Sequence, residues 1–477
     1  MKNMMKNENQ RTRVGLGLLA LGLLGLASCG GASEPRPNLL VISIDTLRPD
    51  FLSCYGHERV TSPRIDRFAA QGVRFDDVTS ASPWTLPSHA SLLTGLYPSS
   101  HGVKDHDRQL TRGTMATRLQ EEGYQTLAVV NTHNIGDPRF GLLRGFQSAH
   151  YEEEAEADPN RPSLVGNSGA KVTKRGLRLL SERDQDLPFF LFLHYYDVHT
   201  DFSPDPKWEL EYVDTYDGEL TGNTQQLIKY RHEDVQMDPK DARWLEQMYE
   251  AEIRTFDEVI GRVFDYLDAH QLADNTLVVI TSDHGEEYLE HGSVLHGRTY
   301  YEEVIRIPLL VRGPGVPAGA QVAEAVHLID VAPMIYSLLG VDPEMEMDGV
   351  DLSTLFGPAP KPLAARALFA EADHNNRVDG KDRSDILRMI RRGHDKLIYH
   401  TITGKKELYD LQADPLELND LAASQPERAE ALWIELKAFI ERPDTSGVNV
   451  LTDEMSQEDL DKLERLGYGG GDDEEDE

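Results

Sequence analysis

The chain has 477 residues, of which 39% are apolar and 27% are charged, so it can bury a sizeable core in one large α/β domain or in two to three domains. Its 82 acidic residues outnumber its 48 basic ones and give a formal net charge of -34, which excludes general nucleic-acid binding because no cations are in excess. Two cysteines cannot build a disulfide framework, and the composition is neither collagen-like nor that of a disordered chain.

The first residues have the pattern of an export signal. Basic residues between positions 2 and 13 precede an apolar stretch from Val14 to Ser28 that is too short to span a bilayer. Its end, Leu-Ala-Ser-Cys, resembles a bacterial lipoprotein signal, in which Cys29 becomes the acylated first residue of the mature chain. A plain secretory signal with an incidental cysteine is the alternative. We expect a signal peptide at 1–28, a tether at 29–37 and a lipid anchor in the bacterial cell envelope, on its periplasmic or outer-membrane face.

Strands and helices alternate along the rest of the chain. Uninterrupted apolar runs predict strands buried on both faces of a sheet, and helices are marked by amphipathic periodicity with proline or polar residues at the start and glycine at the end. The expected strands span 38–44, 125–130, 189–193 and 276–280, and the expected helices span 64–71, 111–122, 169–183, 241–270 and 426–442. Residues 208–240 are polar and irregular, as in a substrate-recognition loop. This order predicts a doubly wound, mostly parallel α/β sheet flanked by helices.

Acidic residues and histidines follow three of the expected strands. Asp45 follows the first strand, Asp197 and His199 follow the third, and Asp283 and His284 follow the last. Each alone reads as a solvated loop group. In a doubly wound sheet, however, ligands bind beyond the carboxyl ends of the strands, and oxygen and imidazole groups converging there suit a divalent cation. Together they predict a metal site.

A threonine between the first strand and the next is a candidate nucleophile. In the stretch SPWTLPSHASLLTG, Pro87 suits a first helical turn and Gly95 a helix end, which places Thr85 at a helix N-terminus. There the free N–H groups and the helix dipole favour an anionic ligand and a partly deprotonated hydroxyl. The alternative is an ordinary N-cap.

Several stretches together resemble the sulfatase family of the alkaline phosphatase superfamily, from residue 38 to about residue 421. They are NLLVISIDTLRPDFLSCYG, SPRIDRFAAQGVRF, LPSHASLLTGLYPSSHGV, FFLFLHYYDVHTDF, TLVVITSDHGEEYLEHGSVLHG, RIPLLVRGPG, HLIDVAPMIYSLLG and KELYDLQADPLELNDL. The resemblance implies hydrolysis at a sulfur or phosphorus ester. It also implies a catalytic domain at 38–360 and a small α+β subdomain at 361–445, after which 446–477 reads as an acidic, disordered tail.

The sequence departs from the family pattern at the nucleophile. Sulfatases typically carry Cys or Ser followed by x-Pro-x-Arg, and the first residue is oxidised to formylglycine. Here Thr85 begins the motif and His89 ends it, and threonine would give a ketone, so no formylglycine is expected. His284 replaces an expected asparagine, and an imidazole ligand favours zinc or manganese over calcium. The pattern is similar to the threonine-using branch, which includes phosphodiesterases, nucleotide pyrophosphatases and the phosphoethanolamine or phosphoglycerol transferases of cell envelopes.

That resemblance implies a role for each candidate residue. One or two divalent ions are expected, the first held by a set that also binds the Thr85 oxygen. His89 would contact the oxyanion or the leaving group, His291 reads as a solvated loop histidine, and Glu286 and Glu287 read as carboxylates at the surface or hydrogen-bonded to metal ligands. The expected metal set is Asp45, Thr85, Asp283 and His284, and the set for a second metal or the substrate oxyanion is Asp197, His199 and His296.

Three functions of different classes follow. The leading one is a metal-dependent hydrolase of phosphate or sulfate esters that favours phosphodiester or phosphonate-type hydrolysis through Thr85. The second is an envelope transferase of phospho-groups, against which the absence of spanning segments counts. The third is a non-catalytic binding protein with the same fold. The expected partners are a small-molecule, glycan or lipid ester and, through Cys29, a membrane, with no nucleic acid; the oligomeric state stays open.

Overall fold

The computed structural model describes residues 36–152, 168–232, 237–373, 377–378, 381–382, 386–443 and 449–451. The signal peptide predicted at 1–28, the lipidation site Cys29 and most of the tether lie outside these residues. Residues 36–477 form one compact unit. In the part of the chain that the structure describes, no helix combines the length and apolar character needed to cross a membrane.

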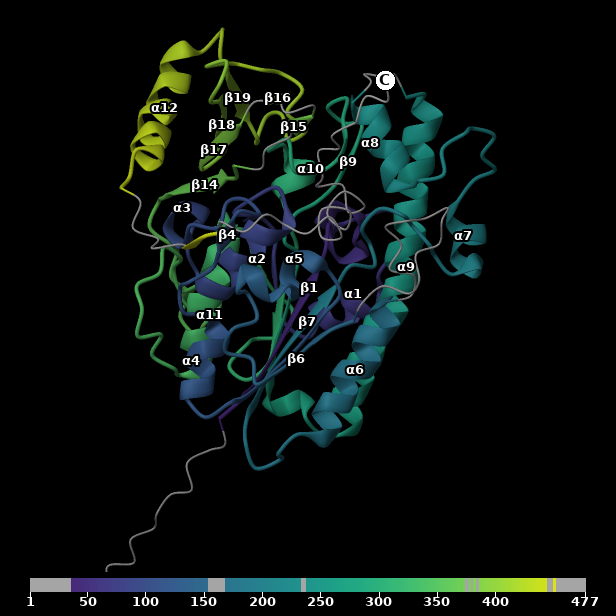
Figure 1. Cartoon of the computed structure of the whole chain (residues 1–477), viewed down its shortest axis with the longest axis vertical. Coiled ribbons are helices and arrows are strands. Elements are labelled where there is room, and N and C mark those ends of the chain that lie inside the picture. The colour runs from purple at the N-terminus through teal and green to yellow at the C-terminus, as the bar shows by residue number, and fades with distance from the viewer. Residues whose placement is uncertain are drawn as a thin grey trace, which may run out of the picture. The chain divides into compact units, whose positions relative to one another are not determined.

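An eight-stranded sheet forms the centre of the fold (Figure 1). Only one of its strands, β11, runs antiparallel to its neighbours, so the predicted mostly parallel sheet is confirmed. In spatial order the strands are β12 (Ala320–Val322), β2 (Val73–Phe75), β11 (Leu309–Arg312), β8 (Thr276–Thr281), β1 (Asn38–Ile44), β7 (Phe189–Tyr195), β5 (Gln125–Val130) and β6 (Ser148–Tyr151).

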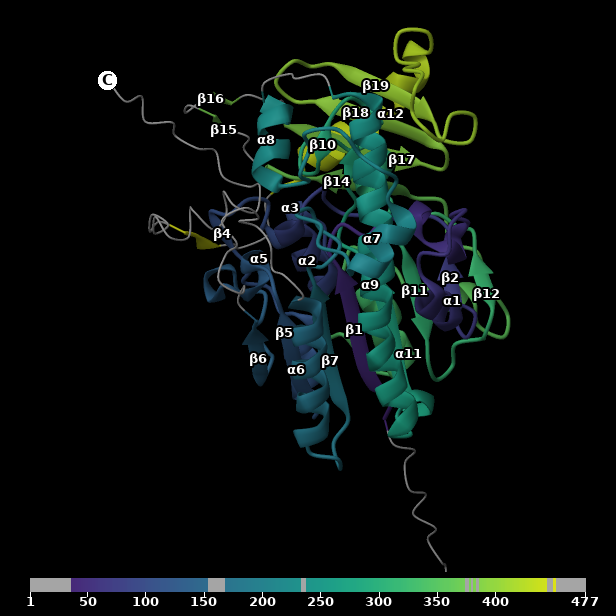
Figure 2. The same cartoon turned by 90° about the vertical axis from the view of Figure 1, so that its right-hand side faces the viewer.

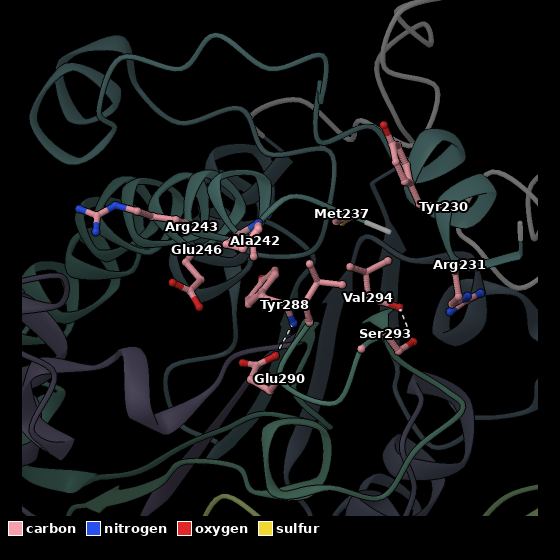
Figure 3. A pocket seen from close by; sticks show the side chains of 13 residues that line it. Tyr230, Arg231, Met237, Ala242, Arg243, Glu246, Tyr288, Glu290, Ser293 and Val294 are labelled. Atoms are coloured by element: carbon pink, nitrogen blue, oxygen red, sulfur yellow. Dashed lines mark hydrogen bonds between the residues drawn. The ribbon is translucent and has the colours of Figure 1, made fainter. Parts of the chain in front are cut away.

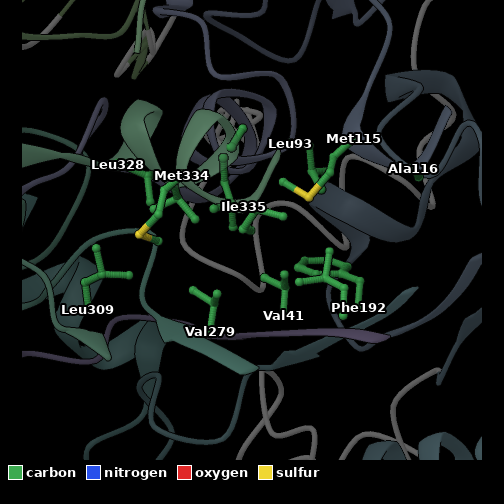
Figure 4. Close-up of a cluster of buried hydrophobic side chains, with 14 of the residues drawn as sticks. Val41, Leu93, Met115, Ala116, Phe192, Val279, Leu309, Leu328, Met334 and Ile335 are labelled. Carbon is green, nitrogen blue, oxygen red and sulfur yellow. The ribbon is translucent and has the colours of Figure 1, made fainter. Parts of the chain in front are cut away.

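Helices cover both faces of this sheet because its central strands are apolar on both sides. Leu39 and Val41 of β1 join one buried cluster, and Leu40 and Ile42 join the other. Figure 4 shows the face that carries Val41, which lies between Val279 and Phe192 of the neighbouring strands and beneath side chains of the covering helices. Figure 2 looks onto the opposite face of the sheet. The first face packs against α2 (Thr85–Thr94), α4 (Met115–Glu121) and α11 (Val331–Leu339), and the second against α1 (Pro63–Ala69), α6 (Ser168–Glu182) and α9 (Pro239–Ala269).

Two boundaries differ from the sequence prediction. The helix expected at 111–122 begins at Met115, because the Thr114 side chain accepts the Thr117 N–H and caps it there. The region 208–240 is not irregular throughout: it contains most of α7 (Pro206–Tyr212), α8 (Thr224–His232) and the start of α9. The tail expected from residue 446 lies outside the described residues except for 449–451, where β20 (Asn449–Val450) pairs antiparallel with β4 (Arg108–Gln109).

A second sheet and α12 (Pro426–Ile440) form the C-terminal part and lie above the carboxyl ends of the central strands in Figure 1. This antiparallel sheet consists of β14 (Ala367–Glu371), β17 (Leu387–Arg392), β18 (Asp395–His400) and β19 (Lys406–Asp410). One face of this sheet packs on α12. The other face packs on Val304 and Ile305 of α10 (Glu302–Ile305) and on Tyr300, which precedes that helix. The small C-terminal α+β element is therefore confirmed.

The remaining short elements connect these layers. They are α3 (Pro98–His101), α5 (His133–Gly136), the pair β3 (Val78–Thr79) and β13 (Val326–His327), the pair β15 (Arg377–Val378) and β16 (Lys381–Asp382), and the hairpin of β9 (Glu287–Tyr288) and β10 (Val294–Leu295). The loop of this hairpin carries His291, which is not solvated as expected. Both of its ring nitrogens face acceptors, the Glu303 carboxylate and the Glu417 carbonyl oxygen, so the C-terminal part holds the hairpin.

Lys396 lies near this contact between the hairpin and the C-terminal part and is fully buried between two carboxylates. Its Nζ is 3.0 Å from Glu302 Oε1 and 2.8 Å from Glu417 Oε1. We expect Lys396→Met to lower the free energy of unfolding by about 3–5 kcal/mol, because it leaves buried charges without a partner. Denaturant unfolding measures this, with Lys171→Met on the exposed side of α6 as the matched control. A loss below about 1 kcal/mol would contradict the assignment of a buried ion pair.

The ion pair between His291 and Glu303 makes the free energy of unfolding depend on pH. Burial alone would lower the pKa of His291, but the hydrogen bond and charge of Glu303 outweigh it and raise the pKa to about 9. The unfolded chain releases this proton near pH 6.5, so between about pH 6.5 and 9 it binds fewer protons than the folded chain. The stabilisation from His291 is therefore complete below about pH 6.5 and is lost as the pH rises through 9. Unfolding midpoints of wild type and His291→Gln should converge over this window; a constant difference would refute the ion pair.

Candidate active site

The carboxyl ends of three adjacent strands define the site. β1 pairs in parallel with β7 on one side and with β8 on the other. Asp45 directly follows β1, and Asp283 and His284 follow β8 after one residue. Because parallel neighbours end at the same edge, these three fully buried side chains meet there, as the sequence predicts.

Asp45, Asp283 and His284 form the first cluster, with ligand atoms all within 4.8 Å of one another. His284 Nε2 lies 3.3 Å from Asp283 Oδ2, 3.7 Å from Asp45 Oδ1 and 3.4 Å from Thr85 Oγ1. Its other ring nitrogen, Nδ1, donates to the Gly285 carbonyl oxygen at 3.0 Å. That bond leaves the Nε2 lone pair directed at the cluster, the arrangement of a metal-binding imidazole.

Thr85 is the first residue of α2, so its predicted place at a helix N-terminus is confirmed. The N-cap is Trp84, which makes no side-chain cap bond, so the interpretation of Thr85 as an ordinary N-cap is wrong. Pro87 is the third helical residue, and Gly95 closes the helix in the left-handed conformation at φ 71°. The Thr85 hydroxyl therefore faces His284 at the positive end of a ten-residue helix.

Backbone groups fix the Asp283 carboxylate. Its Oδ1 accepts the N–H of His284 at 2.9 Å and that of Thr46 at 3.3 Å. Thr46 has a left-handed φ of 54°, and its carbonyl oxygen accepts the Tyr249 hydroxyl at 2.7 Å. This left-handed conformation strains the backbone of a threonine, and the hydrogen bond from Tyr249 helps to stabilise it. One oxygen of Asp283 is thus anchored and the other is left for the cluster.

The donor set fits a divalent cation. Both oxygens of Asp45 and Oδ2 of Asp283 are buried and accept no hydrogen bond of normal geometry from a described residue. Burial raises the pKa of Asp45 to about 6, because the charged carboxylate is unfavourable away from water. Carboxylates and a neutral imidazole are ligands that zinc and manganese accept, and a cation would satisfy these oxygens.

A second cluster lies beside the first and consists of His199, Glu286 and His296. His296 Nδ1 donates to Glu286 Oε1 at 3.0 Å, and the rings of His284 and His296 are 4.3 Å apart between centroids. His199 Nε2 and Glu286 Oε2 are buried without a hydrogen-bond partner among the described side chains. Burial raises the pKa of Glu286 well above its ordinary value. Two adjacent sets of ligand-type groups thus face one space.

Glu286 is fully buried within the second cluster and so is not at the surface, but it accepts a hydrogen bond from the predicted ligand His296, as the other expected arrangement requires. Asp197, expected as a further ligand there, is not part of either cluster; its Oδ1 accepts the Gly169 N–H at 3.0 Å at the start of α6. The sequence signal for Glu286 was its place three residues beyond Asp283, behind the same strand.

His89 lies one helical turn from Thr85 in α2, with both of its ring nitrogens engaged. Its Nδ1 donates to the Thr85 carbonyl oxygen at 2.8 Å, and its Nε2 accepts from the Ser43 hydroxyl at 2.9 Å. Burial lowers the pKa of His89 to about 3, so the ring is neutral. With both nitrogens engaged, His89 positions the nucleophile's helix turn on β1 instead of contacting the oxyanion or leaving group.

Sequence reasoning missed His194. It lies within β7, directly after the predicted apolar run at 189–193, and its Nε2 is 3.4 Å from Asp45 Oδ2. Its Nδ1 donates to Asn131 Oδ1 at 3.1 Å, which turns Nε2 toward the first cluster. Burial lowers the pKa of His194 to about 4, so this imidazole is also neutral.

Comparison with known proteins agrees with this geometry. The sulfatase family's sequence model matches residues 37–341, and the one described as N-sulphoglucosamine sulphohydrolase, C-terminal, matches 290–442. A curated N-acetylglucosamine-6-O-sulfatase of Bacteroides thetaiotaomicron is 25% identical, over 85% of this chain and 86% of its own.

Two solved structures share the fold. The phosphonate monoester hydrolase of Agrobacterium radiobacter has a TM-score of 0.69 at 23% identity, over 89% of this chain and 99% of its own. That of Silicibacter pomeroyi has a TM-score of 0.68 at 19% identity, over 88% of this chain and 100% of its own. Members of the matching family are metal-dependent, in keeping with the clusters found here. The chain belongs to the sulfatase family of the alkaline phosphatase superfamily and is a hydrolase of ester bonds.

Proposed function

We propose that this enzyme hydrolyses phosphorus esters, phosphate diesters and phosphonate monoesters above all, through a covalent ester on Thr85. The observation that carries the proposal is the Thr85 hydroxyl, 3.4 Å from His284 Nε2 at the N-terminus of α2 and beside the buried carboxylates of the first cluster. A nucleophile requires activation of this kind, because a free hydroxyl is weak at its ordinary pKa.

The identity of residue 85 argues against formylglycine chemistry. Oxidation of a threonine hydroxyl yields a ketone, because its Cβ carries a methyl group, so the aldehyde hydrate cannot form at this position. The motif also lacks its arginine, and the histidine in that place is committed to Ser43 and to the Thr85 carbonyl. Thr85 itself is then the group that attacks.

Asp45, Asp283, His284 and the Thr85 oxygen would hold one divalent cation, with zinc or manganese favoured, and His194 lies within reach of the same set. When bound, such a cation lowers the pKa of a hydroxyl and neutralises charge on a phosphoryl oxygen. His199, Glu286 and His296 would hold a second cation or the substrate oxygens.

The reaction proceeds by two displacements at phosphorus. Thr85 Oγ1 loses its proton and forms a bond to phosphorus while the bond to the ester alcohol breaks, and the departing alcohol oxygen takes up a proton. Water then attacks phosphorus, the bond between phosphorus and Thr85 Oγ1 breaks, and Oγ1 takes up one of the water's protons, which releases the phosphorus acid and regenerates the enzyme. The N–H groups at the start of α2 stabilise negative charge that develops near Thr85.

The two phosphonate monoester hydrolases with this fold support phosphorus as the reacting centre. Sulfate ester hydrolysis is the second candidate, because the sulfated-sugar enzyme of Bacteroides thetaiotaomicron matches most of the chain. We also propose export and a lipid anchor at Cys29, for which the amino-acid pattern of residues 1–29 is the support.

Thr85→Ala should reduce turnover of a nitrophenyl phosphonate at least about a thousandfold, because it removes the nucleophile. Unfolding midpoint and bound metal should change little, since the carboxylates and His284 stay in place. Thr85→Ser, which keeps a hydroxyl, should retain measurable activity and a trapped phosphoryl ester in mass spectra of quenched enzyme. Near-normal turnover by Thr85→Ala would refute the nucleophile.

Asp283→Asn and His284→Ala should each lower the metal content by about one ion per chain, because each removes a ligand from the first cluster. Glu286→Gln should lower it through the second cluster. Elemental analysis after dialysis measures all three. Asp197→Asn is the matched control, since Asp197 contacts Gly169 instead of a cluster. Unchanged stoichiometry in the cluster variants, or loss only in Asp197→Asn, would contradict the assignment.

A further inference from the structure

A pocket of about 680 Å³ lies between the end of α8, the start of α9 and the β9–β10 hairpin. Tyr230 and Arg231 line it from α8, Ala242 and Glu246 from α9, and Tyr288, Glu290, Ser293 and Val294 from the hairpin (Figure 3). The function proposed above assigns no role to this pocket.

The pocket adjoins the second cluster through the hairpin. β9 starts directly after Glu286, and β10 ends directly before His296, so the residues that line the pocket continue from the cluster in both chain directions. Arg231 Nη1 donates to the His296 carbonyl oxygen at 3.1 Å, and its charge acts on Glu286. The hairpin therefore connects residues of the second cluster with the wall of this pocket.

Glu246 gives the pocket a negative charge that no ion pair among the described residues neutralises, although the charge of Arg48 acts on it. Its carboxylate is half-buried and forms no ion pair with a described residue. Burial raises the pKa of Glu246, and the neighbouring charge of Glu290 raises it further. A cation beside Glu246 would relieve both effects.

The cations near Glu246 are already committed to other groups. Arg48 is shared by Glu290, at 2.5 Å, and Asp50, at 2.7 Å. Arg243 pairs with Asp214 at 3.0 Å, and in Figure 3 its guanidinium extends away from Glu246 and Tyr288. The negative charge on this side of the pocket is thus left for a ligand.

Tyr288 adds a second, independent feature. It lines the pocket beside Glu246, is only 3% exposed, and its hydroxyl has no hydrogen-bond partner among the described residues. The guanidinium of Arg48 lies over the same ring, 5.7 Å from its centroid, so this wall of the pocket already accommodates a cation.

We propose that this pocket binds the positively charged alcohol part of the ester substrate, an alcohol that carries an amine or quaternary ammonium group, and that Glu246 determines this specificity. The inference deepens the proposed function and rests on it for the identity of the reacting ester. The class of ligand follows from Glu246, Tyr288 and the committed arginines.

The test measures binding without turnover, in metal-loaded Thr85→Ala enzyme. Calorimetry compares choline with its neutral isostere 3,3-dimethylbutan-1-ol, and glucosamine with glucose. We expect at least one cation to bind about tenfold more tightly than its neutral partner, and Glu246→Gln to abolish the difference. Asp268→Asn, an equal charge change at an exposed position of the same helix, should preserve it.

Equal affinity within both pairs, or a preference that survives in Glu246→Gln, would overturn the proposal. Tighter binding of glucuronate than of either cation would overturn it in favour of an acidic sugar. The wild-type comparison within each pair needs no variant, so it holds even if Glu246→Gln folds poorly. Cation binding without hydrolysis of any phosphorus ester would refute the proposed function and leave this pocket assignment standing.

Discussion

The parallel pairing of β8, β1 and β7 is the constraint on which the rest of the site depends. These strands are buried on both faces, so apolar packing fixes their register and leaves polar groups only where the strands end. Asp45, Asp283 and His284 therefore converge at one edge, and His194 at the end of β7 reaches the same space. The position of the ligand-type side chains is therefore set by the residues at which these three apolar strands end.

That convergence places like charges in a buried space, which is unfavourable unless something offsets them. The chain anchors one Asp283 oxygen with backbone N–H groups and orients His284 and His194 through hydrogen bonds at Nδ1. The oxygens and ring nitrogens that remain all face the clusters. Such preorganisation is what a metal-assisted hydrolase needs, because the ligands are in place before the cation and substrate arrive.

The sheet could be predicted from sequence because its apolar runs are uninterrupted, and the members of the first cluster were found because they follow those runs. His194 directly follows the apolar run at 189–193, but the pattern favours Asp197 and His199 further along as the groups at that strand end. Glu286 stands in a short acidic stretch without periodicity, so the sequence predicts only a surface or supporting carboxylate there. The helices α7 and α8 lie in a polar segment whose pattern gives no apolar stripe. His89 required the fold, since only its packing on Ser43 shows that both of its nitrogens are engaged.

The most direct test of phosphorus chemistry through Thr85 is parallel turnover of nitrophenyl sulfate, phosphate monoester, phosphate diester and phosphonate monoester. The enzyme would be the form lacking residues up to Cys29, with zinc, manganese or calcium added. We predict that the diester or the phosphonate is turned over fastest, with zinc or manganese. Turnover of sulfate alone would contradict this prediction and would mean that threonine can serve a sulfatase without formylglycine.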